Sequence, residues 1–316
     1  MKSALVTGGA GFIGAHLCQS LCRDGYQVTA LDNFYSSDET KIEKLKQEFP
    51  QNFTFIHHDV RVPFSENKLQ DSGVQEIYHL ACPASPPAYG KDQLFTLETS
   101  VLGIKNFLDL AVKIKARFLL TSTSEIYGDP MEHPQNENYR GNVNTFGPRA
   151  CYDEGKRVGE TLCYIYRKIV DVRVCRIFNT YGPGMHAYDG RVITNFFQSL
   201  KNNQPLPIYG SGKQTRSFCY ISDMVQGIRK LMGSTVEGPI NLGNPREISI
   251  LELAQVVSKI AGREFKTIHS ELPQDDPHLR NPVIERAKKE LQWQPQVSLE
   301  SGLLNMYEEF LSSNCS

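Results

Sequence analysis

Three glycines near the amino terminus constrain the fold more than any other part of the sequence. Gly8, Gly11 and Gly14 lie three residues apart in the stretch SALVTGGAGFIGAHLCQSLCRDGYQVTALDN, between a strand-like apolar run and a helix-like pattern. Gly9, Gly11 and Gly14 also satisfy the spacing G-x-G-x-x-G. Such glycines allow a tight turn and a close backbone approach, so a pyrophosphate can bind at the amino terminus of the next helix. The stretch therefore predicts a strand, a turn, a helix and a strand that bind a dinucleotide.

The second predicted strand ends in Asp32, which lies 18 positions after Gly14 (32 − 14 = 18). An acid about 20 positions after the glycines is typical of a site that binds the adenosine ribose. Because a carboxylate repels a 2′-phosphate, Asp32 favours NAD over NADP. The alternative is a structural turn with an incidental aspartate, and the surrounding strand-helix-strand pattern disfavours it.

Strands and helices continue to alternate through the first half of the chain. FTFIHHD, QEIYHLAC, RFLLTSTSE and DVRVCRIFN read as further strands, and six apolar residues recur at helical spacing between two of them: Leu94, Leu97, Val101, Ile104, Leu108 and Ala111. This alternation predicts an α/β fold with a doubly wound parallel sheet of the Rossmann type. The loop CPASPPAYG is so rich in proline that we predict no helix there. Ligands of such sheets bind beyond the carboxyl ends of the strands.

After residue 179 the alternation weakens and turn-rich clusters appear. We predict a nucleotide-binding domain over residues 1–178, joined by residues 217–241, and a smaller lobe over residues 179–316. Ser249 and Glu252 have the spacing of a capping box and predict a helix start. Residues 281–311 are typical of surface helices.

Composition disfavours several classes of function. The 316 residues carry a formal net charge of −1, which gives no reason to expect nucleic acid or an anionic membrane as partner. No apolar run approaches the ~20 residues that span a bilayer, and MKSALVTGGAG does not read as a signal peptide. The eight cysteines have no paired metal spacing. We therefore expect a soluble cytoplasmic protein without a metal site.

Tyr152 and Lys156 lie four residues apart in GPRACYDEGKR, which places both side chains on one face of a helix. A nearby cation favours the phenolate, so the pair can provide a base near neutral pH. Alone, a pair at this spacing is more often an ordinary surface pair. Thr123, Ser124 and Glu125 follow a predicted strand, where a hydroxyl can bind substrate and a carboxylate can exchange a proton. Beside a dinucleotide site we favour function for all five residues.

Together these motifs resemble the extended short-chain dehydrogenase/reductase family. The closer similarity is to the UDP-glucuronate decarboxylases, and it runs from residue 2 to about residue 295. The segments that carry it are HLACPASPP, STSEIYGDP, GPRACYDEGKR, FNTYGP, MHAYDGRVITNF, YGSGKQTRSFCYISD, NLGNP and QDDPHLRNP. Their joint order is more specific than any one of them.

The resemblance implies a reaction that begins with oxidation of a sugar. Tyr152 would take the proton of the C4 hydroxyl while NAD accepts the C4 hydride. Lys156 would bind the nicotinamide ribose and lower the tyrosine pKa, and Thr123 would donate a hydrogen bond to the reacting oxygen. The product of this step is a 4-keto sugar acid.

The same resemblance implies that this β-keto acid loses its carboxylate and that the cofactor then returns its hydride. Ser124 and Glu125 would assist at the sugar acid. Arg280 would supply a positive charge for the carboxylate or a proton route to the enolate. Release of the 4-keto intermediate stays open.

Binding residues also follow from the resemblance. Those implied for NAD are Gly8, Gly11, Phe12, Ile13, Gly14, Asp32, Asn33, Asp59, Val60, Leu80, Ala81, Tyr152 and Lys156. Those implied for a UDP-sugar, mostly in the smaller lobe, are Pro86, Tyr89, Glu125, Asn179, Arg191, Asn195, Tyr209, Gln214, Arg216 and Arg280. A homodimer is expected, in which Phe107, Cys163, Tyr164 and Tyr166 either join a helix bundle or belong to the core.

Several positions depart from the family pattern, and basic residues are lost at some of them. Gly184 stands where the family usually has Arg, Asn281 where it has Lys, and Val283 where it has Asp. Phe95 and Glu98 stand where lysines are common, and Arg140 and Thr145 replace Trp and Pro. The segment FYSSDETK lacks the usual Gly-Arg/Lys turn. These changes either weaken binding of an acidic sugar or lie outside the pocket.

Three functions therefore remain to be separated. Glu125 disfavours a C4-epimerase but not a nucleotide-sugar 4,6-dehydratase, whereas Arg280 favours the decarboxylase. A non-catalytic nucleotide sensor would have no need of Thr123, Tyr152 and Lys156 together.

Overall fold

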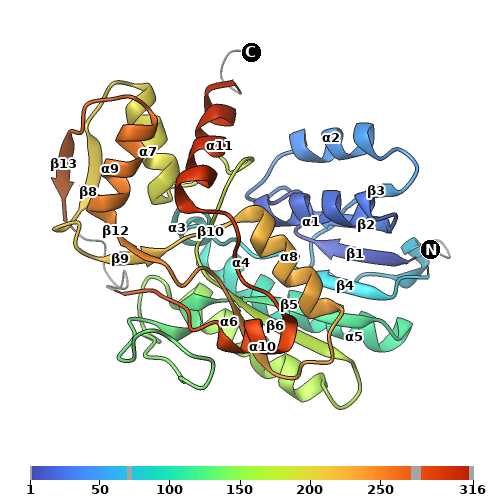
Figure 1. Cartoon of the computed structure of the whole chain (residues 1–316). Helices are drawn as coiled ribbons and strands as arrows, with labels where there is room; N and C mark the ends of the chain where they lie inside the picture. The colour runs from blue at the N-terminus through green and yellow to red at the C-terminus, as the bar shows by residue number, and fades with distance from the viewer. Residues whose placement is uncertain (1, 70–72, 272–278, 313–316) are drawn as a thin grey trace.

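The structure is a computed structural model that describes residues 2–69, 73–271 and 279–312 (Figure 1). Its elements up to the sixth strand are β1 Ser3–Thr7, α1 Phe12–Arg23, β2 Gln27–Asp32, α2 Thr40–Glu48, β3 Phe53–His57, the 3₁₀ turn Glu66–Leu69, β4 Glu76–His79, α3 Pro86–Lys91, α4 Gln93–Glu98, the π-helical turn Thr99–Gly103, α5 Ile104–Ile114, β5 Arg117–Thr123, the 3₁₀ turn Ser124–Tyr127, α6 Ala150–Tyr166 and β6 Val172–Ile177. The later elements are β7 Thr180–Tyr181, α7 Val192–Lys201, β8 Leu206–Tyr209, β9 Thr215–Ser217, β10 Cys219–Tyr220, α8 Ile221–Met232, β11 Pro239–Leu242, β12 Glu247–Ser249, α9 Ile250–Ile260, β13 Thr267–Ser270, α10 Glu285–Leu291 and α11 Leu299–Ser312.

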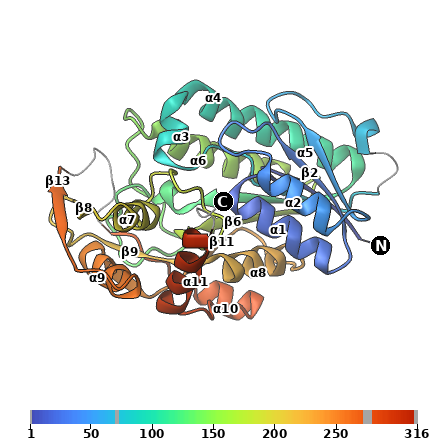
Figure 2. The same cartoon turned by 90° about the horizontal axis from the view of Figure 1, so that it is seen from above.

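A seven-stranded sheet in the order β11-β6-β5-β4-β1-β2-β3 organises the described part of the chain. Every neighbouring pair in it is parallel. Figure 2 shows α4, α5 and α6 on one face of this sheet and α1, α2 and α8 on the other. The predicted doubly wound α/β fold is confirmed. The strand order reverses between β1 and β4, which is where ligands bind in sheets of this kind.

The sheet is buried on both faces because its strands are nearly continuous apolar runs. All five residues of β1 are buried, as expected of a central parallel strand covered by helices. One apolar core joins the sheet to α1 and α8, and a second joins it to α5 and α6. The segments α8 and β11 therefore belong to the large sheet and its core, although they follow parts of the smaller lobe in the sequence. The exact domain boundaries stay a prediction.

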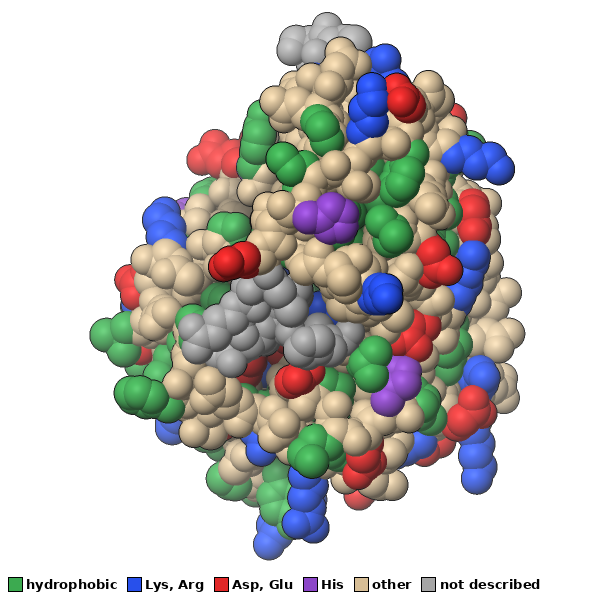
Figure 3. Space-filling model, turned by 90° about the vertical axis from the view of Figure 1, so that its left-hand side faces the viewer, with side chains coloured by type: hydrophobic (Ala, Val, Ile, Leu, Met, Phe, Trp, Pro, Cys, Tyr) green, Lys and Arg blue, Asp and Glu red, His purple; other side chains and the backbone are tan. Residues whose placement is uncertain are grey.

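The smaller lobe has its own core, built from α7, α9 and α11 together with β8. The predicted capping box is confirmed, because Ser249 Oγ accepts from the backbone N–H of Glu252 while the Glu252 carboxylate accepts from that of Ser249. Figure 3 shows acidic and basic side chains interspersed over the face of the molecule that includes this lobe. Within the described ranges, every helix is too short or too polar to cross a membrane.

One sequence-based expectation about the segment around α3 and α4 needs correction. The proline-rich loop CPASPPAYG is not free of helix, because α3 begins at Pro86. Prolines in the first turn of a helix lack only N–H groups that would have no partner there, so Pro86 and Pro87 are compatible with a helix start. The helical spacing of Leu94 and Leu97 is correct, but these two side chains are exposed.

Residues considered for a dimer interface separate into two groups. Phe107 and Cys163 are buried within the core on the α5–α6 face of the sheet. Tyr164 is 64% exposed. The first two therefore pack intramolecularly, whereas Tyr164 is available for contact with another molecule.

Candidate active site

A cleft of about 1040 Å³ runs along the carboxyl ends of the central strands and continues against the smaller lobe. Every residue implied for NAD lines it, and so does every residue implied for the UDP-sugar except Arg280. The cleft thus brings together residues that lie as far apart in the sequence as Gly8 and Arg216. Their individual roles stay predictions.

The glycine turn forms one end of the cleft. Gly8 has φ +71°, and a Cβ atom there would lie 2.8 Å from the backbone nitrogen of Ala81. At Gly14 a Cβ would lie 2.0 Å from the carbonyl oxygen of Gly8. Only glycine fits at both positions, and α1 begins directly after the turn with Gly11 as its N-cap. The backbone N–H groups at this helix start suit a pyrophosphate.

Asp32 holds the neighbouring wall of the cleft in place. Its Oδ2 accepts from the backbone N–H of Ala10 at 3.0 Å, and its Oδ1 accepts from the N–H of Phe34 at 2.9 Å and from Ser37 Oγ at 3.1 Å. The carboxylate therefore links the glycine turn to the loop after β2. A carboxylate at the end of β2 fits an adenosine ribose and repels a 2′-phosphate, so the residues present fit NAD.

Tyr152 and Lys156 enter the cleft from the first turns of α6, and both are buried. Lys156 Nζ donates to the carbonyl oxygen of Thr121 at 2.9 Å and lies 5.9 Å from the centroid of the Tyr152 ring. The expected low pKa of Tyr152 is not found. Burial raises the pKa of this phenol well above its usual value and Cys82 adds to the effect, while a hydrogen bond from the Thr123 hydroxyl opposes it.

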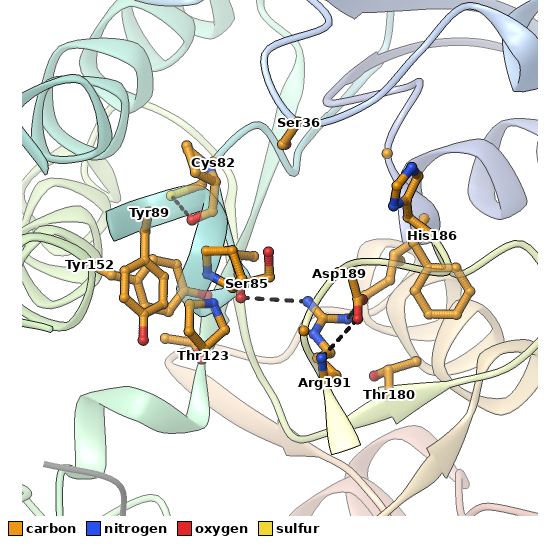
Figure 4. Close-up of a pocket in the computed structure, with 18 of the residues that line it drawn as sticks. Ser36, Cys82, Ser85, Tyr89, Thr123, Tyr152, Thr180, His186, Asp189 and Arg191 are labelled. Carbon is orange, nitrogen blue, oxygen red and sulfur yellow. Dashed lines mark hydrogen bonds and ion pairs between the residues drawn. The ribbon is translucent and has the colours of Figure 1, made fainter. Parts of the chain in front are cut away.

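The Tyr152 ring is fixed by a second aromatic ring. Tyr89, from α3, stacks on it with 5.3 Å between ring centroids and 11° between ring planes. Figure 4 shows the two rings face to face with Thr123 beside them, while Arg191 and Asp189 approach from the other wall. The helix at Pro86–Lys91, which the sequence did not predict, is therefore the element that brings Tyr89 to the tyrosine.

A buried group of charges lies next to this tyrosine. Oε2 of Glu125 accepts from Nη2 of Arg149 at 2.5 Å and from Nη2 of Arg280 at 3.2 Å. Burial raises the pKa of Glu125, but Arg280, Arg149 and Arg216 outweigh it and hold the pKa at about 2. Glu125 is therefore ionised at neutral pH and cannot act there as a general acid. Its carboxylate holds the guanidinium groups of Arg149 and Arg280 near Tyr152.

Arg280 does not line the cleft itself but lies directly behind Glu125. It is 1% exposed and also donates from Nη2 to the carbonyl oxygen of Gly128 at 3.0 Å. Its Nε and Nη1 have no hydrogen-bond partner among the described residues. A buried guanidinium with unused donors is costly unless a further acceptor approaches it, such as a carboxylate. Residues 274–278 of the motif QDDPHLR lie outside the described residues.

Sequence reasoning missed two members of this charged group. Arg149 and Asp153 are four residues apart, with 4.0 Å between Arg149 Nε and Asp153 Oδ2. Burial, and then Glu125, raise the pKa of Asp153 to about 7, against the opposing effects of Arg149 and Arg280. The helical spacing of an arginine and an aspartate around the tyrosine was the signal that could have revealed them.

The smaller lobe provides polar groups at the other end of the cleft. Nη2 of Arg191 donates across the cleft to the carbonyl oxygen of Ala84 at 3.4 Å, and its Nη1 lies 3.6 Å from Asp189 Oδ2. Gln214 Nε2 donates to the carbonyl oxygen of Tyr209 at 2.7 Å. Arg216 is 8% exposed and its charge reaches Glu125. This end can therefore bind an anionic, aromatic ligand such as a nucleoside diphosphate.

Most departures from the family pattern lie away from the cleft. Gly184, Arg140, Thr145, Asn281 and Val283 are not among its described lining residues. Asn281 and Val283 instead pair through their backbones with Gln135. The exceptions are Phe95 and the segment FYSSDETK, of which Tyr35, Ser36, Ser37, Asp38 and Lys41 line the cleft. Loss of basic residues at these positions therefore leaves the charged group around Glu125 intact.

Comparisons with known proteins agree with this geometry. The model of the GDP-mannose 4,6 dehydratase family matches residues 5–306. The chain belongs to this family. It is 49% identical to UDP-glucuronic acid decarboxylase 1 of Xenopus tropicalis over 304 residues, which are 96% of this chain and 70% of that one. It is 48% identical to UDP-glucuronic acid decarboxylase 1 of Arabidopsis thaliana, over 97% of this chain and 69% of that one.

Solved structures of two epimerases are also similar. UDP-glucose 4-epimerase of Thermotoga maritima with UDP-glucose has a TM-score of 0.90 at 25% identity, covering 98% of this chain and 99% of that one. UDP-glucuronic acid 4-epimerase of Bacillus cereus, in complex with UDP-glucuronic acid and NAD, has a TM-score of 0.87 at 29% identity, with the same coverage of each chain. The expected membership of the extended short-chain dehydrogenase/reductases is confirmed. Among the described residues, no group of acidic, His and Cys side chains could hold a metal ion.

Proposed function

We propose that this chain converts UDP-glucuronate to UDP-xylose through oxidation at C4, loss of the carboxylate and re-reduction. The relatives at 48% and 49% identity are UDP-glucuronic acid decarboxylases, and the similarity covers nearly the whole chain. NAD is the cofactor: the glycine turn and Asp32 fit it, and the Bacillus cereus neighbour is in complex with it. Bound NAD would supply the oxidising and reducing equivalents for the sugar C4 carbon.

The first half of the reaction requires removal of a proton from the C4 hydroxyl. Tyr152 is the base, and its hydrogen bond with the Thr123 hydroxyl marks where the sugar oxygen would lie. Because burial raises the phenol pKa, the tyrosine holds its proton in the resting protein and needs a nearby positive charge to lose it. Lys156, one helical turn away, provides one positive charge. A second positive charge would come from the nicotinamide ring of bound NAD.

The second half requires a place for the sugar carboxylate, and one observation carries this part of the proposal. Arg149 and Arg280 both bind the same oxygen of Glu125, and Nε and Nη1 of the buried Arg280 have no hydrogen-bond partner among the described residues. Two arginines outnumber the Glu125 carboxylate, and Asp153, with its pKa raised to about 7, is only partly ionised at neutral pH, so the group keeps a net positive charge. An anionic sugar acid would neutralise it. Loss of the carboxylate as CO₂ then leaves an enolate, which the same cations stabilise.

A C4-epimerase that acts on UDP-glucuronate is the second candidate. It is favoured by the Bacillus cereus neighbour, a UDP-glucuronic acid 4-epimerase at 29% identity. Both reactions share the oxidation at C4, so Tyr152 and Lys156 cannot separate them. The epimerase must protect the carboxylate from loss, whereas buried cations that stabilise the enolate favour its loss. The charged group around Glu125 therefore supports the decarboxylase.

The proposal includes a homodimer in the cytoplasm. Exposed apolar side chains gather on α5, α6 and the turn before α5, namely Leu102, Val112, Val158, Tyr164 and Ile165. A second copy of the chain would cover them as a helix bundle. The cysteines of the described residues are free, which suits a reducing compartment. The division into a cofactor domain, residues 1–178 with 217–241, and a substrate lobe, residues 179–316, belongs to the same proposal.

The reaction can be tested directly. Purified protein would be incubated with NAD and UDP-glucuronate, and the sugar anomeric signals would be followed by NMR together with CO₂ release. UDP-xylose and CO₂ in equal amounts are expected. If neither forms, the proposal fails, and UDP-glucose, GDP-mannose and UDP-N-acetylglucosamine become the substrates to examine.

A further inference from the structure

Three segments around the adenosine end of the cleft are joined by a stack of side chains. Tyr35, from the loop after β2, stacks on Phe95 of α4 with 4.1 Å between ring centroids and 13° between planes. The guanidinium carbon of Arg61, from the segment after β3, lies 4.1 Å from the centroid of the same Phe95 ring. Two groups at this separation cannot share one face of a ring, so Phe95 lies between Tyr35 and Arg61. We call these three side chains the aromatic bridge.

Each end of the aromatic bridge is fixed by polar contacts. Arg61 binds both carboxylate oxygens of Asp59 at 2.8–3.2 Å, and its Nη1 donates to Oε2 of Glu98 at 2.9 Å. The backbone carbonyl of Arg61 accepts from Nδ2 of Asn106 at 2.9 Å, which ties the segment to α5. At the other end, the backbone N–H of Tyr35 donates to Oδ1 of Asn33 at 3.1 Å. The bridge therefore connects three anchored segments.

The aromatic bridge forms part of the cleft wall. Tyr35 and Phe95 line the cleft, together with the residues implied for adenosine: Asp32, Asn33, Asp59 and Val60. Arg61 acts from behind, because it holds the Asp59 carboxylate in one orientation. The stack holds the loop after β2 against α4, so separation of these two segments would break the contact between the rings.

We propose that the aromatic bridge closes the adenosine end of the cleft and slows the release of NAD. This rests on the proposed function only in taking NAD as the ligand. It also gives a role to two departures from the family pattern, Phe95 and Glu98, which stand where lysines are common. A lysine at position 95 could not stack on Tyr35, and a lysine at position 98 would repel Arg61.

The test compares the rate of NAD release among five variants and the unchanged protein: Phe95→Ala, Tyr35→Ala, the double variant of these two, Tyr35→Phe and Leu94→Ala. Protein loaded with radiolabelled NAD is mixed with excess unlabelled NAD, and the label that stays bound is followed with time. Phe95→Ala removes the centre of the bridge and Tyr35→Ala removes one stacking partner. Tyr35→Phe is the matched control, because the buried Tyr35 Oη has no hydrogen-bond partner among the described residues. Leu94→Ala truncates a 65% exposed side chain next to Phe95.

Phe95→Ala is expected to release NAD about tenfold faster or more, since it loses both the stacked ring and the cation over its face. Tyr35→Ala should accelerate NAD release less than Phe95→Ala does. The double variant of Tyr35 and Phe95 should release NAD no faster than Phe95→Ala. The two controls, Tyr35→Phe and Leu94→Ala, should release it at the rate of the unchanged protein. Equal release rates for Phe95→Ala and the unchanged protein would overturn the bridge while leaving the proposed reaction intact. Failure of the unchanged protein to bind NAD would overturn both. Thermal unfolding of each variant confirms that it is folded.

Discussion

Arg280 donates from Nη2 to Oε2 of Glu125 at 3.2 Å; Arg280 is buried, whereas Glu125 is partly exposed in the cleft that also contains the residues that would oxidise the sugar. The two residues are 155 positions apart in the sequence, so only the fold brings them together. Arg149 binds the same Glu125 oxygen, so one carboxylate holds two guanidinium groups.

Substitution of Arg280 should impair loss of the carboxylate more than oxidation at C4. Arg280→Lys keeps the charge but loses the planar guanidinium and its unused donors, so kcat should fall by about 100-fold. The absorbance of the reduced cofactor should still rise when UDP-glucuronate is added. Arg263→Gln, which changes an exposed arginine, is the control. If oxidation at C4 and loss of the carboxylate are impaired equally, Arg280 contributes to substrate binding and not specifically to decarboxylation.

Tyr152→Phe should abolish most turnover while both ligands still bind. Removal of the phenolic hydroxyl removes the proposed base, a loss of about 10²–10⁴ in kcat, while the ring keeps its stacking on Tyr89. Turnover and NAD affinity would be measured in parallel. Tyr164→Phe on the same helix is the matched control, because Tyr164 is exposed. Full activity of Tyr152→Phe would remove the tyrosine from the mechanism.

Asp153→Asn should make the stability of the protein less dependent on pH. The pKa of Asp153 is raised from 3.8 to about 7, so the folded protein holds a proton that the unfolded chain has lost. The stability linked to this group is therefore fully present below pH about 4 and is lost as the pH rises through about 7. Asp153→Asn cannot ionise, so its melting temperature relative to the unchanged protein should rise by a few degrees between pH 5 and pH 8.

Glu154→Gln, one position further along α6, provides the comparison for that experiment. Its side chain is half-buried and paired with Arg157. We expect the same difference in melting temperature at both pH values for this variant. If the melting temperatures of Asp153→Asn and the unchanged protein change in parallel between pH 5 and pH 8, Asp153 is already ionised in the folded protein at pH 5.

Exposed apolar residues on α6 should control assembly. Ile165→Glu introduces a charge at a 59% exposed position on the proposed dimer face, so light scattering after size-exclusion chromatography should detect a monomer. Met131→Glu, at an 83% exposed position elsewhere, should leave the mass unchanged. If Ile165→Glu and the unchanged protein both have the molar mass of a dimer, this face is not the dimer interface.

Local patterns were sufficient to predict the sheet and its ligand-binding end. The glycine turn, Asp32 and the Tyr152–Lys156 pair each combine residue type with a fixed spacing along the chain, and spacing is what sequence records directly. The start of α3 was missed because prolines usually interrupt helices, although they are tolerated in the first turn. The raised pKa of Tyr152 in this structure was not predicted, because the burial of its ring depends on Tyr89 and other segments distant in sequence.

Contacts between segments that are distant in sequence could not be predicted in this way. The aromatic bridge joins Tyr35, Arg61 and Phe95, none of which carries a motif of its own. Arg149 was present in a quoted motif, but its bond to Glu125 depends on the turn that ends β5. These pairings follow from how the strands are ordered in the sheet, which local spacing does not specify.

The most direct test of the proposed reaction follows the carboxyl carbon of the substrate. UDP-glucuronate labelled with carbon-13 at this carbon and with deuterium at C4 would be incubated with the protein and NAD, and the products examined by NMR. The proposed mechanism predicts that the label appears as CO₂ and bicarbonate, and that deuterium is found at C4 of UDP-xylose. UDP-galacturonate that retains the carboxyl label would contradict it and identify an epimerase.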